Sequence, residues 1–138
     1  MNDLRRFVDA QSAGVYETAL RELREGAKRG HWIWFIFPQI AGLGHSEVSR
    51  HFSLAGVEEA TAYVNHPLLG PRLVECVRAM LAWGGERSAQ DVLGMLDARK
   101  FQSSMTLFEV AATDPRPFST ALDVFFAGRR DDATMERV

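Results

Sequence analysis

The chain has 138 residues, of which 46% are hydrophobic and 25% are charged, and its net charge at pH 7 is −2. These values predict one globular domain over residues 1–138. They argue against nucleic acid as the main partner, because a protein that binds phosphate backbones needs a surplus of basic residues. The longest apolar run, Trp32 to Phe37, is far shorter than the roughly 20 residues of a membrane span, so no membrane association is predicted.

Cysteine content and the beginning of the chain bear on the compartment. Cys76 is the single cysteine, so no internal disulfide can form, and no apolar signal segment opens the sequence. Both features predict a cytoplasmic protein. No histidine pair has metal-ligand spacing and no phosphate-binding fingerprint is present, so neither a metal nor a cofactor is expected. The sequence leaves the oligomeric state open.

Most segments between glycines and prolines have helical periodicity. In chain order, we expect helices over residues 2–11, 15–28, 46–52, 57–64, 71–83, 88–96, 97–112 and 114–128, with Ser88 and Asp97 as N-caps of the sixth and seventh. The tail, residues 131–138, adds at most one turn. The predicted fold is all-α: a single compact multi-helix domain of about seven or eight short helices.

The aromatic run "HWIWFIF", residues 31–37, is apolar on every face. A segment of this kind is buried nearly all round. Its composition would suit a strand, but no second strand is predicted that would pair its backbone groups. We therefore expect a short helix or an ordered turn here.

Polar residues flank the aromatic run and make it a candidate ligand pocket. Lys28 could hold a phosphate or carboxylate, and His31 could transfer a proton because its ordinary pKa lies near neutrality. Gln39 could orient a ligand through hydrogen bonds, and Trp32 or Trp34 could stack on a flat ring. The alternative interpretation is that the run belongs to the hydrophobic core.

A second polar group lies in the predicted helix 97–112. Ser103 and Ser104 stand at adjacent helical positions, where hydroxyls gain little intrinsically. They suit either close helix packing or the polar floor of a pocket. A catalytic His31 would also need a carboxylate partner. Three residues are candidates for this partner: Glu22, Glu75 and Asp97.

Several motifs give the chain a family resemblance. The motifs are "HWIWFIFPQ", "GLG", "HPLLGPRL" and "KFQSSMTLF", and in this order and spacing they resemble the DUF1810 family of small bacterial proteins. The resemblance covers about Phe7 to Thr134 and implies an all-helical fold, whereas the family has no established biochemical function. The family often has serine or threonine where this chain has Gly30. A short segment, "AYVNHPLLGPRLVE", is also similar to NADAR proteins, which are linked to ADP-ribose-type chemistry.

Two functional hypotheses follow. In the first, the protein has a pocket for a small anionic ligand of nucleotide or ribosyl-phosphate type, with His31 as the catalytic residue if it is a hydrolase. Its ligand-binding residues would be Lys28, Trp32, Trp34, Gln39, Ser103 and Ser104. In the second, the protein is a non-enzymatic interaction module that uses the aromatic segment 32–37 to contact a protein partner. Solvent exposure of the two tryptophans distinguishes these hypotheses.

Overall fold

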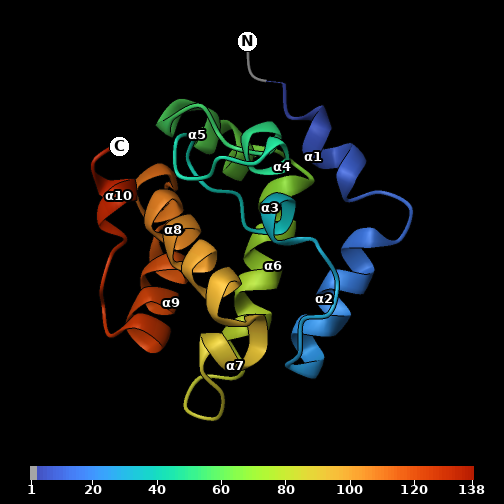
Figure 1. Cartoon of the computed structure of the whole chain (residues 1–138), viewed down its shortest axis with the longest axis vertical. Coiled ribbons are helices and arrows are strands. Elements are labelled where there is room, and N and C mark those ends of the chain that lie inside the picture. Colours follow the sequence, from blue (N-terminus) through green and yellow to red (C-terminus); the bar gives the residue numbers. More distant parts are fainter. Residues whose placement is uncertain (1–2) are drawn as a thin grey trace.

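The computed structural model describes residues 3–138, which form ten helices and no β-strand (Figure 1). The prediction of an all-α fold is therefore confirmed. The helices are α1 (Arg5–Ala10), α2 (Val15–Glu25), α3 (Ile33–Ile36), α4 (Glu47–His51), α5 (Val57–Asn65), α6 (Leu69–Leu81), α7 (Ala89–Leu93), α8 (Met95–Ala111), α9 (Arg116–Phe126) and α10 (Asp132–Met135). The number exceeds eight because the aromatic run and the tail each form a four-residue helix.

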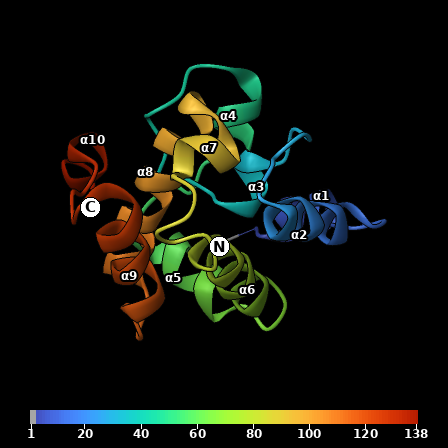
Figure 2. The same cartoon turned by 90° about the horizontal axis from the view of Figure 1, so that it is seen from below.

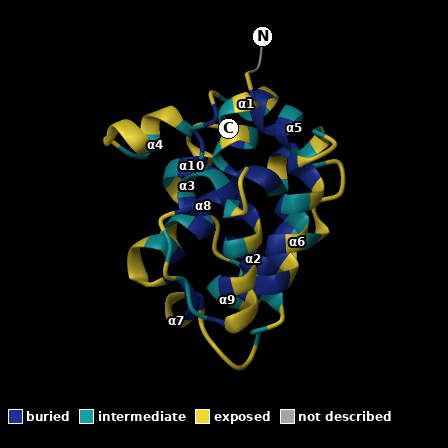
Figure 3. Ribbon diagram, turned by 90° about the vertical axis from the view of Figure 1, so that its right-hand side faces the viewer, coloured by how far each residue is buried: buried dark blue, intermediate teal, exposed yellow. Residues whose placement is uncertain are grey.

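Helix α8 lies at the centre of the arrangement. It contacts α3, α5, α7, α9 and α10, whereas α6 packs against α2, α5 and α9. In the two perpendicular views α2 and α9 lie on opposite sides of the molecule (Figures 1 and 2). The buried side chains from these helices form a continuous hydrophobic core. The exposed residues gather on α4, the connecting loops and the outer faces of the helices (Figure 3).

The turn between α5 and α6 is fixed by two residues of the "HPLLGPRL" motif. The Nδ1 atom of His66 accepts hydrogen bonds from the backbone N–H groups of Leu68 (3.1 Å) and Leu69 (3.2 Å), so the imidazole caps the start of α6. Gly70 packs against α5 so closely that an added Cβ would lie 2.1 Å from the carbonyl oxygen of Val64. Only glycine fits there, which fixes the angle at which α6 leaves the turn.

The start of α8 differs from the prediction. Ser88 caps α7 through a capping box with Asp91, as predicted, but α8 begins at Met95 with Gly94 as its N-cap. Asp97 is the third residue of the helix, and its carboxylate accepts charged side-chain donors from Lys28 and Lys100 instead of backbone N–H groups. The predicted N-cap at Asp97 was therefore wrong, because a long-range ion pair decides the role of this carboxylate.

The longest helix of residues 3–138 is α8, and its seventeen residues include charged side chains. Neither α8 nor any other helix in this range combines the length and hydrophobicity required to cross a bilayer.

Candidate functional site

The aromatic run lies in the core. Trp32, Ile33, Ile36 and Phe37 are no more than 3% exposed, whereas Trp34 and Phe35 are partly buried. The Phe37 ring contacts that of Phe101 with 4.7 Å between centroids, which joins the run to α8. At most two of the six side chains in segment 32–37 are thus available to a docked partner.

Lys28 and Asp97 form a largely buried ion pair that connects the aromatic run to α8. The Nζ atom of Lys28 lies 2.7 Å from Oδ2 of Asp97, and the lysine side chain is only 8% exposed. This ammonium also donates to the carbonyl of Gly30 and lies 5.1 Å from the ring centroid of Trp32. Lys100 approaches the second carboxylate oxygen at 3.3 Å. The predicted ligand contact at Lys28 would have to compete with these partners.

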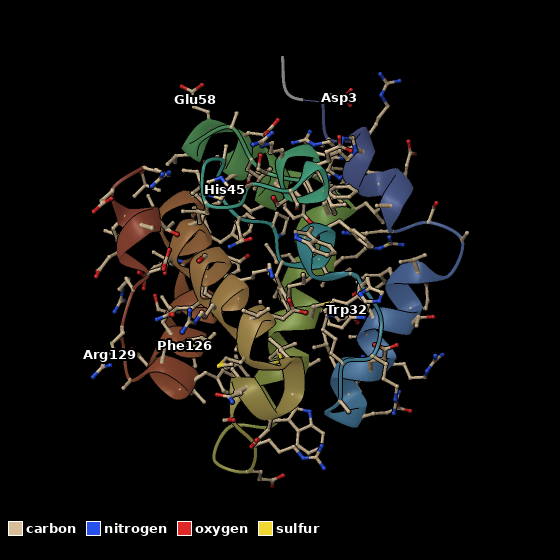
Figure 4. The ribbon with its side chains drawn as sticks, viewed as in Figure 1. Asp3, Trp32, His45, Glu58, Phe126 and Arg129 are labelled. Atoms are coloured by element: carbon tan, nitrogen blue, oxygen red, sulfur yellow. The ribbon has the colours of Figure 1, made fainter. Side chains whose placement is uncertain are left out.

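Trp32 has a specific partner for its indole N–H. Its Nε1 atom donates to Oε1 of Glu22 at 3.0 Å, and the same oxygen accepts the backbone N–H groups of Arg29 and Gly30. Figure 4 shows Trp32 on the inner side of α2, the helix that carries Glu22. Burial by itself would raise the pKa of Glu22, but the hydrogen bonds outweigh it and hold the pKa below its ordinary value. Glu22 is therefore a charged structural acceptor.

The side chain of His31 lies on the surface. It borders an open hollow of about 240 Å³ whose other lining residues are Ala13, Gly14, Val15, Thr18, Gly30, Trp32 and Phe35. None of these lining residues is a carboxylate. Of the three predicted partners, Glu22 and Asp97 are engaged by other residues, as described above.

The remaining predicted residues are dispersed. Gln39 and Trp34 line a small cavity of about 20 Å³ beside α4, which has room for about one water molecule. Ser103 and Ser104 are buried within α8, where the Ser103 hydroxyl donates to the carbonyl of Arg99 at 3.1 Å. The seven predicted site residues thus do not line one common pocket.

Ser104 has a fully buried hydroxyl without a hydrogen-bond partner among residues 3–138. An unpaired buried hydroxyl costs free energy of folding, so we expect Ser104→Ala to raise the free energy of unfolding by about 1 kcal/mol. Urea denaturation measures the difference, and Ser103→Ala is the matched control because it removes a hydroxyl that does have a partner. A clear loss of stability in Ser104→Ala would contradict this expectation.

A groove on the outer face of α6 was missed by the sequence analysis. It has a volume of about 850 Å³ and runs along the outer face of α6 beside the end of α2. Its charged lining residues are Arg24, Arg72, Glu75, Arg78 and Glu86, and its uncharged ones are Pro67, Leu68, Pro71, Ala79, Ala82 and Trp83. On α6 these residues recur at spacings of three and four, which places them on one face of the helix.

Arg72 lines this groove and is held in place by two side chains. Its guanidinium lies 4.4 Å from the ring centroid of Tyr16 and donates to Oε1 of Gln11 at 3.3 Å. Gln11 is buried, and its amide donates to the hydroxyl of Tyr63 and to the carbonyl of Phe35. A buried polar network thus connects the groove to the aromatic run. Networks of this kind restrict the side chains they contain to one arrangement.

Glu75 lies one helical turn from Arg72 and is held by a hydrogen bond from Tyr16. The buried Tyr16 hydroxyl donates to its Oε1 atom, while Arg24 approaches Oε2 at 3.7 Å. Burial, together with the neighbouring Cys76 and Glu75, raises the pKa of Tyr16, so its hydroxyl stays protonated and remains a donor. Among the three carboxylates predicted as partners of His31, Glu75 is the one in the groove.

Trp83 is the aromatic residue that lines the groove. Its Nε1 atom donates to the carbonyl of Leu23 at 2.8 Å, and the guanidinium of Arg87 lies 4.5 Å from its ring centroid. These contacts fix the plane of the indole. The sequence signal for the groove was weak, since the exposed stripe of α6 has the same pattern as an ordinary solvated helix face.

Two further kinds of site, a metal site and a reactive cysteine, are not found among the described residues. Residues 3–138 contain no group of three or more histidine, cysteine, aspartate or glutamate side chains arranged to hold a metal ion. Cys76 is buried, and burial raises the pKa of its thiol to about 12. It therefore stays protonated and unreactive at neutral pH.

Comparison with known proteins places the chain in a family. The family model described as "Protein of unknown function (DUF1810)" matches residues 1–138, the whole chain. The chain belongs to the DUF1810 family. The resemblance predicted from the motifs is thus confirmed. The DUF1810 motifs "HWIWFIFPQ" and "KFQSSMTLF" pack against each other through Phe37 and Phe101, whereas "HPLLGPRL" borders the groove.

One solved structure similar to this DUF1810 chain is the crystal structure of the conserved hypothetical protein Rv1873 from Mycobacterium tuberculosis. The two chains are 44% identical, and the match covers 97% of this chain and 94% of that one with a TM-score of 0.92. No curated protein matches the chain.

Gly30 is the position at which the family resemblance predicts serine or threonine. In this chain an added Cβ at Gly30 would lie 2.8 Å from Cδ1 of Trp32. The glycine therefore lets the indole pack close to the backbone while its own N–H donates to Glu22. A hydroxyl at this position would require Trp32 to shift.

Proposed function

We propose that the protein binds a small organic anion with a flat ring in the groove along α6. The observation that carries the proposal is the convergence of three arginines from two helices on one groove: Arg24 from α2, and Arg72 and Arg78 from α6. The groove's volume of about 850 Å³ lies within the range of roughly 300–1,000 Å³ common for small-molecule sites.

The charge of the groove favours an anion. Arg24 is partly neutralised by Glu75, but within residues 3–138 neither Arg72 nor Arg78 forms an ion pair with a carboxylate. A planar guanidinium binds phosphate or carboxylate through two parallel hydrogen bonds. Because Arg72 is already held by Tyr16 and Gln11, it loses little side-chain entropy when a ligand binds.

The apolar part of the groove favours a flat ring. Ala79 and Ala82 have short side chains that leave room above the helix, and Trp83 stands beside them. Indole rings stack well on heteroaromatic rings, and here the indole is fixed by its hydrogen bond to Leu23. A nucleotide or another aromatic phosphate combines the two features that the groove would recognise.

The groove has replaced the aromatic run as the proposed binding site. A catalytic role of His31, a hydrolase activity, and ligand contacts of Lys28, Trp32, Trp34, Gln39, Ser103 and Ser104 stay predictions. The hollow beside His31 is the second place where a ligand could bind, because it combines an imidazole with apolar walls.

The test is thermal denaturation of the protein with a panel of nucleotides, ADP-ribose, sugar phosphates and aromatic carboxylates. A ligand at 100 times its Kd adds about 2.7 kcal/mol to the free energy of unfolding, which raises Tm by several degrees. We expect at least one aromatic phosphate to do so. Arg72→Ala and Arg78→Ala should each weaken its binding about tenfold.

Two controls locate the ligand. Arg129→Ala removes an arginine that does not line the α6 groove (Figure 4) and should leave affinity unchanged. His31→Ala tests the hollow at the aromatic run. If binding were lost in His31→Ala but kept in both groove variants, the α6 site would be rejected in favour of the hollow. A panel without any shift would reject the small-anion function.

A further inference from the structure

Glu75 is a feature of the α6 groove that an anion-binding function does not explain, and it lies between two of the groove's arginines on α6. It lies three residues from Arg72 and three from Arg78, so all three side chains share a face of α6. Its side chain is 48% exposed. A carboxylate at this place repels an anion, so a purely anionic ligand would bind better without it. The ligand must therefore carry, besides its anionic group, a hydrogen-bond donor or a positive charge that a carboxylate binds.

The carboxylate of Glu75 has unused acceptor capacity. An ionised carboxylate offers about four lone-pair sites. Tyr16 donates to Oε1, while Arg24 lies 3.7 Å from Oε2, beyond ordinary hydrogen-bond distance. Tyr16 is buried and its own ring supports Arg72, so the hydroxyl that orients Glu75 is itself fixed. The carboxylate is thus oriented with acceptor sites left for a ligand in the groove.

The spacing along α6 suggests which part of the ligand meets this carboxylate. Ala79, where the flat ring would rest, is four residues from Glu75, or about 6 Å along the helix axis. Arg72 lies three residues the other way, or about 4.5 Å. Along this face the groove therefore has a place for a flat ring, with Arg78 adding positive charge beside it, then Glu75 for hydrogen-bond donors, then Arg72 for an anionic group. A ribonucleotide has its base, its ribose hydroxyls and its phosphate in this order.

We infer that Glu75 accepts hydrogen bonds from the vicinal ribose hydroxyls of a ribonucleotide and makes the groove selective for ribonucleotides over deoxyribonucleotides. This inference rests on the proposed function of the α6 groove. Carboxylates bind ribose hydroxyls in this way in dinucleotide-binding domains. Glu75 is thus the residue that determines specificity, and Tyr16 is the residue that positions it.

The experiment compares the four common ribonucleoside 5′-diphosphates with their 2′-deoxy counterparts by calorimetric titration of the full chain. We expect the wild-type protein to bind at least one ribonucleotide about tenfold more tightly than its deoxy form, since a hydrogen bond to a charged acceptor is lost. In Glu75→Gln, the ratio should fall to about threefold or less. The affinity for the deoxy form should stay equal or rise, because the repulsive charge is gone.

The matched control is Glu86→Gln, which removes the other carboxylate that lines the groove and should keep the ratio of wild type. Tyr16→Phe should lower the ratio without abolishing phosphate binding, because Glu75 keeps its charge but loses its anchor. Unchanged thermal denaturation without ligand shows that each variant is folded.

The outcomes separate the two claims. If ribo- and deoxyribonucleotides bound equally to wild type, the role of Glu75 would be disproved while the proposed function would stand. If Glu75→Gln bound ribo- and deoxyribonucleotides equally weakly, Glu75 would have a structural role in the groove and would not bind the ribose hydroxyls. If no nucleotide bound while another aromatic anion of the panel did, the inference alone would fail; if nothing on the panel bound, both claims would fail.

Discussion

Replacement of Asp97 by alanine is expected to lower the free energy of unfolding by about 3–5 kcal/mol, because it leaves the ammonium of Lys28 buried without its counter-ion. The lysine side chain is 8% exposed and its Nζ atom lies 2.7 Å from the carboxylate. Lys100 would lose the same partner, although it is more exposed. Urea denaturation followed by circular dichroism measures the effect.

Replacement of the other partner, Lys28, should lower the free energy of unfolding much less. In Lys28→Met the carboxylate of Asp97 keeps Lys100 at 3.3 Å, and an apolar side chain of similar length replaces the lysine stem beside Trp32. Loss of one partner of a buried ion pair is costly when the other charge is left unpaired, but Asp97 keeps Lys100 and is 19% exposed, so we expect a loss of about 1 kcal/mol or less. Equal losses in Asp97→Ala and Lys28→Met would show that the unpaired ammonium is not the cause.

Glu22→Ala is the second substitution with a large expected effect, a loss of about 3 kcal/mol or more. It removes the acceptor of three N–H groups at once, and the indole N–H of Trp32 is buried with them. Each hydrogen bond to a charged acceptor contributes roughly 1.5–3 kcal/mol, although neighbouring contributions are not additive. Chemical denaturation measures this loss. Glu25→Gln, on the exposed face of α2, is the control and should leave stability unchanged.

The pH dependence of stability gives an independent test of Glu22. Its folded-state pKa is below the ordinary value of 4.5, so the charged carboxylate stabilises the fold fully above that value. The contribution is lost as the pH falls through the lowered folded-state pKa. Glu22→Gln has no carboxylate to protonate, so its stability should fall less steeply below about pH 4.5 than that of wild type. Parallel curves for the two proteins would contradict the role assigned to Glu22.

These two carboxylates explain why the aromatic run combines charged and aromatic residues. Glu22 binds the indole N–H of Trp32, and Asp97 pairs with Lys28 beside the same indole. Lys28, one of the polar flanks that resemble a pocket rim, is thus taken up by an ion pair at the edge of the core. Exposure, which was to distinguish the two functional hypotheses, supports a core role for most of segment 32–37.

Sequence patterns predicted the helices well, whereas they gave no distinct signal for the groove along α6. The stripe on α2, the capping box at Ser88 and the end of α5 before Pro67 depend on neighbouring residues, so they can be recognised locally. The roles of Asp97 and Lys28 depend on a contact between residues 69 positions apart. A capping preference in the sequence could not compete with that ion pair.

The amino-acid sequence by itself determined the all-α class, the family and the burial of the aromatic run, because periodicity, motif order and the absence of any polar face are properties of consecutive residues. Only the tertiary structure decided which polar groups meet. It pairs Lys28 with Asp97 and bonds the indole N–H of Trp32 to Glu22. It also places Arg24 of α2 in one groove with Arg72 and Arg78 of α6. Grooves form where helices that are distant in the chain pack together. A pattern in consecutive residues does not show which distant helices will pack.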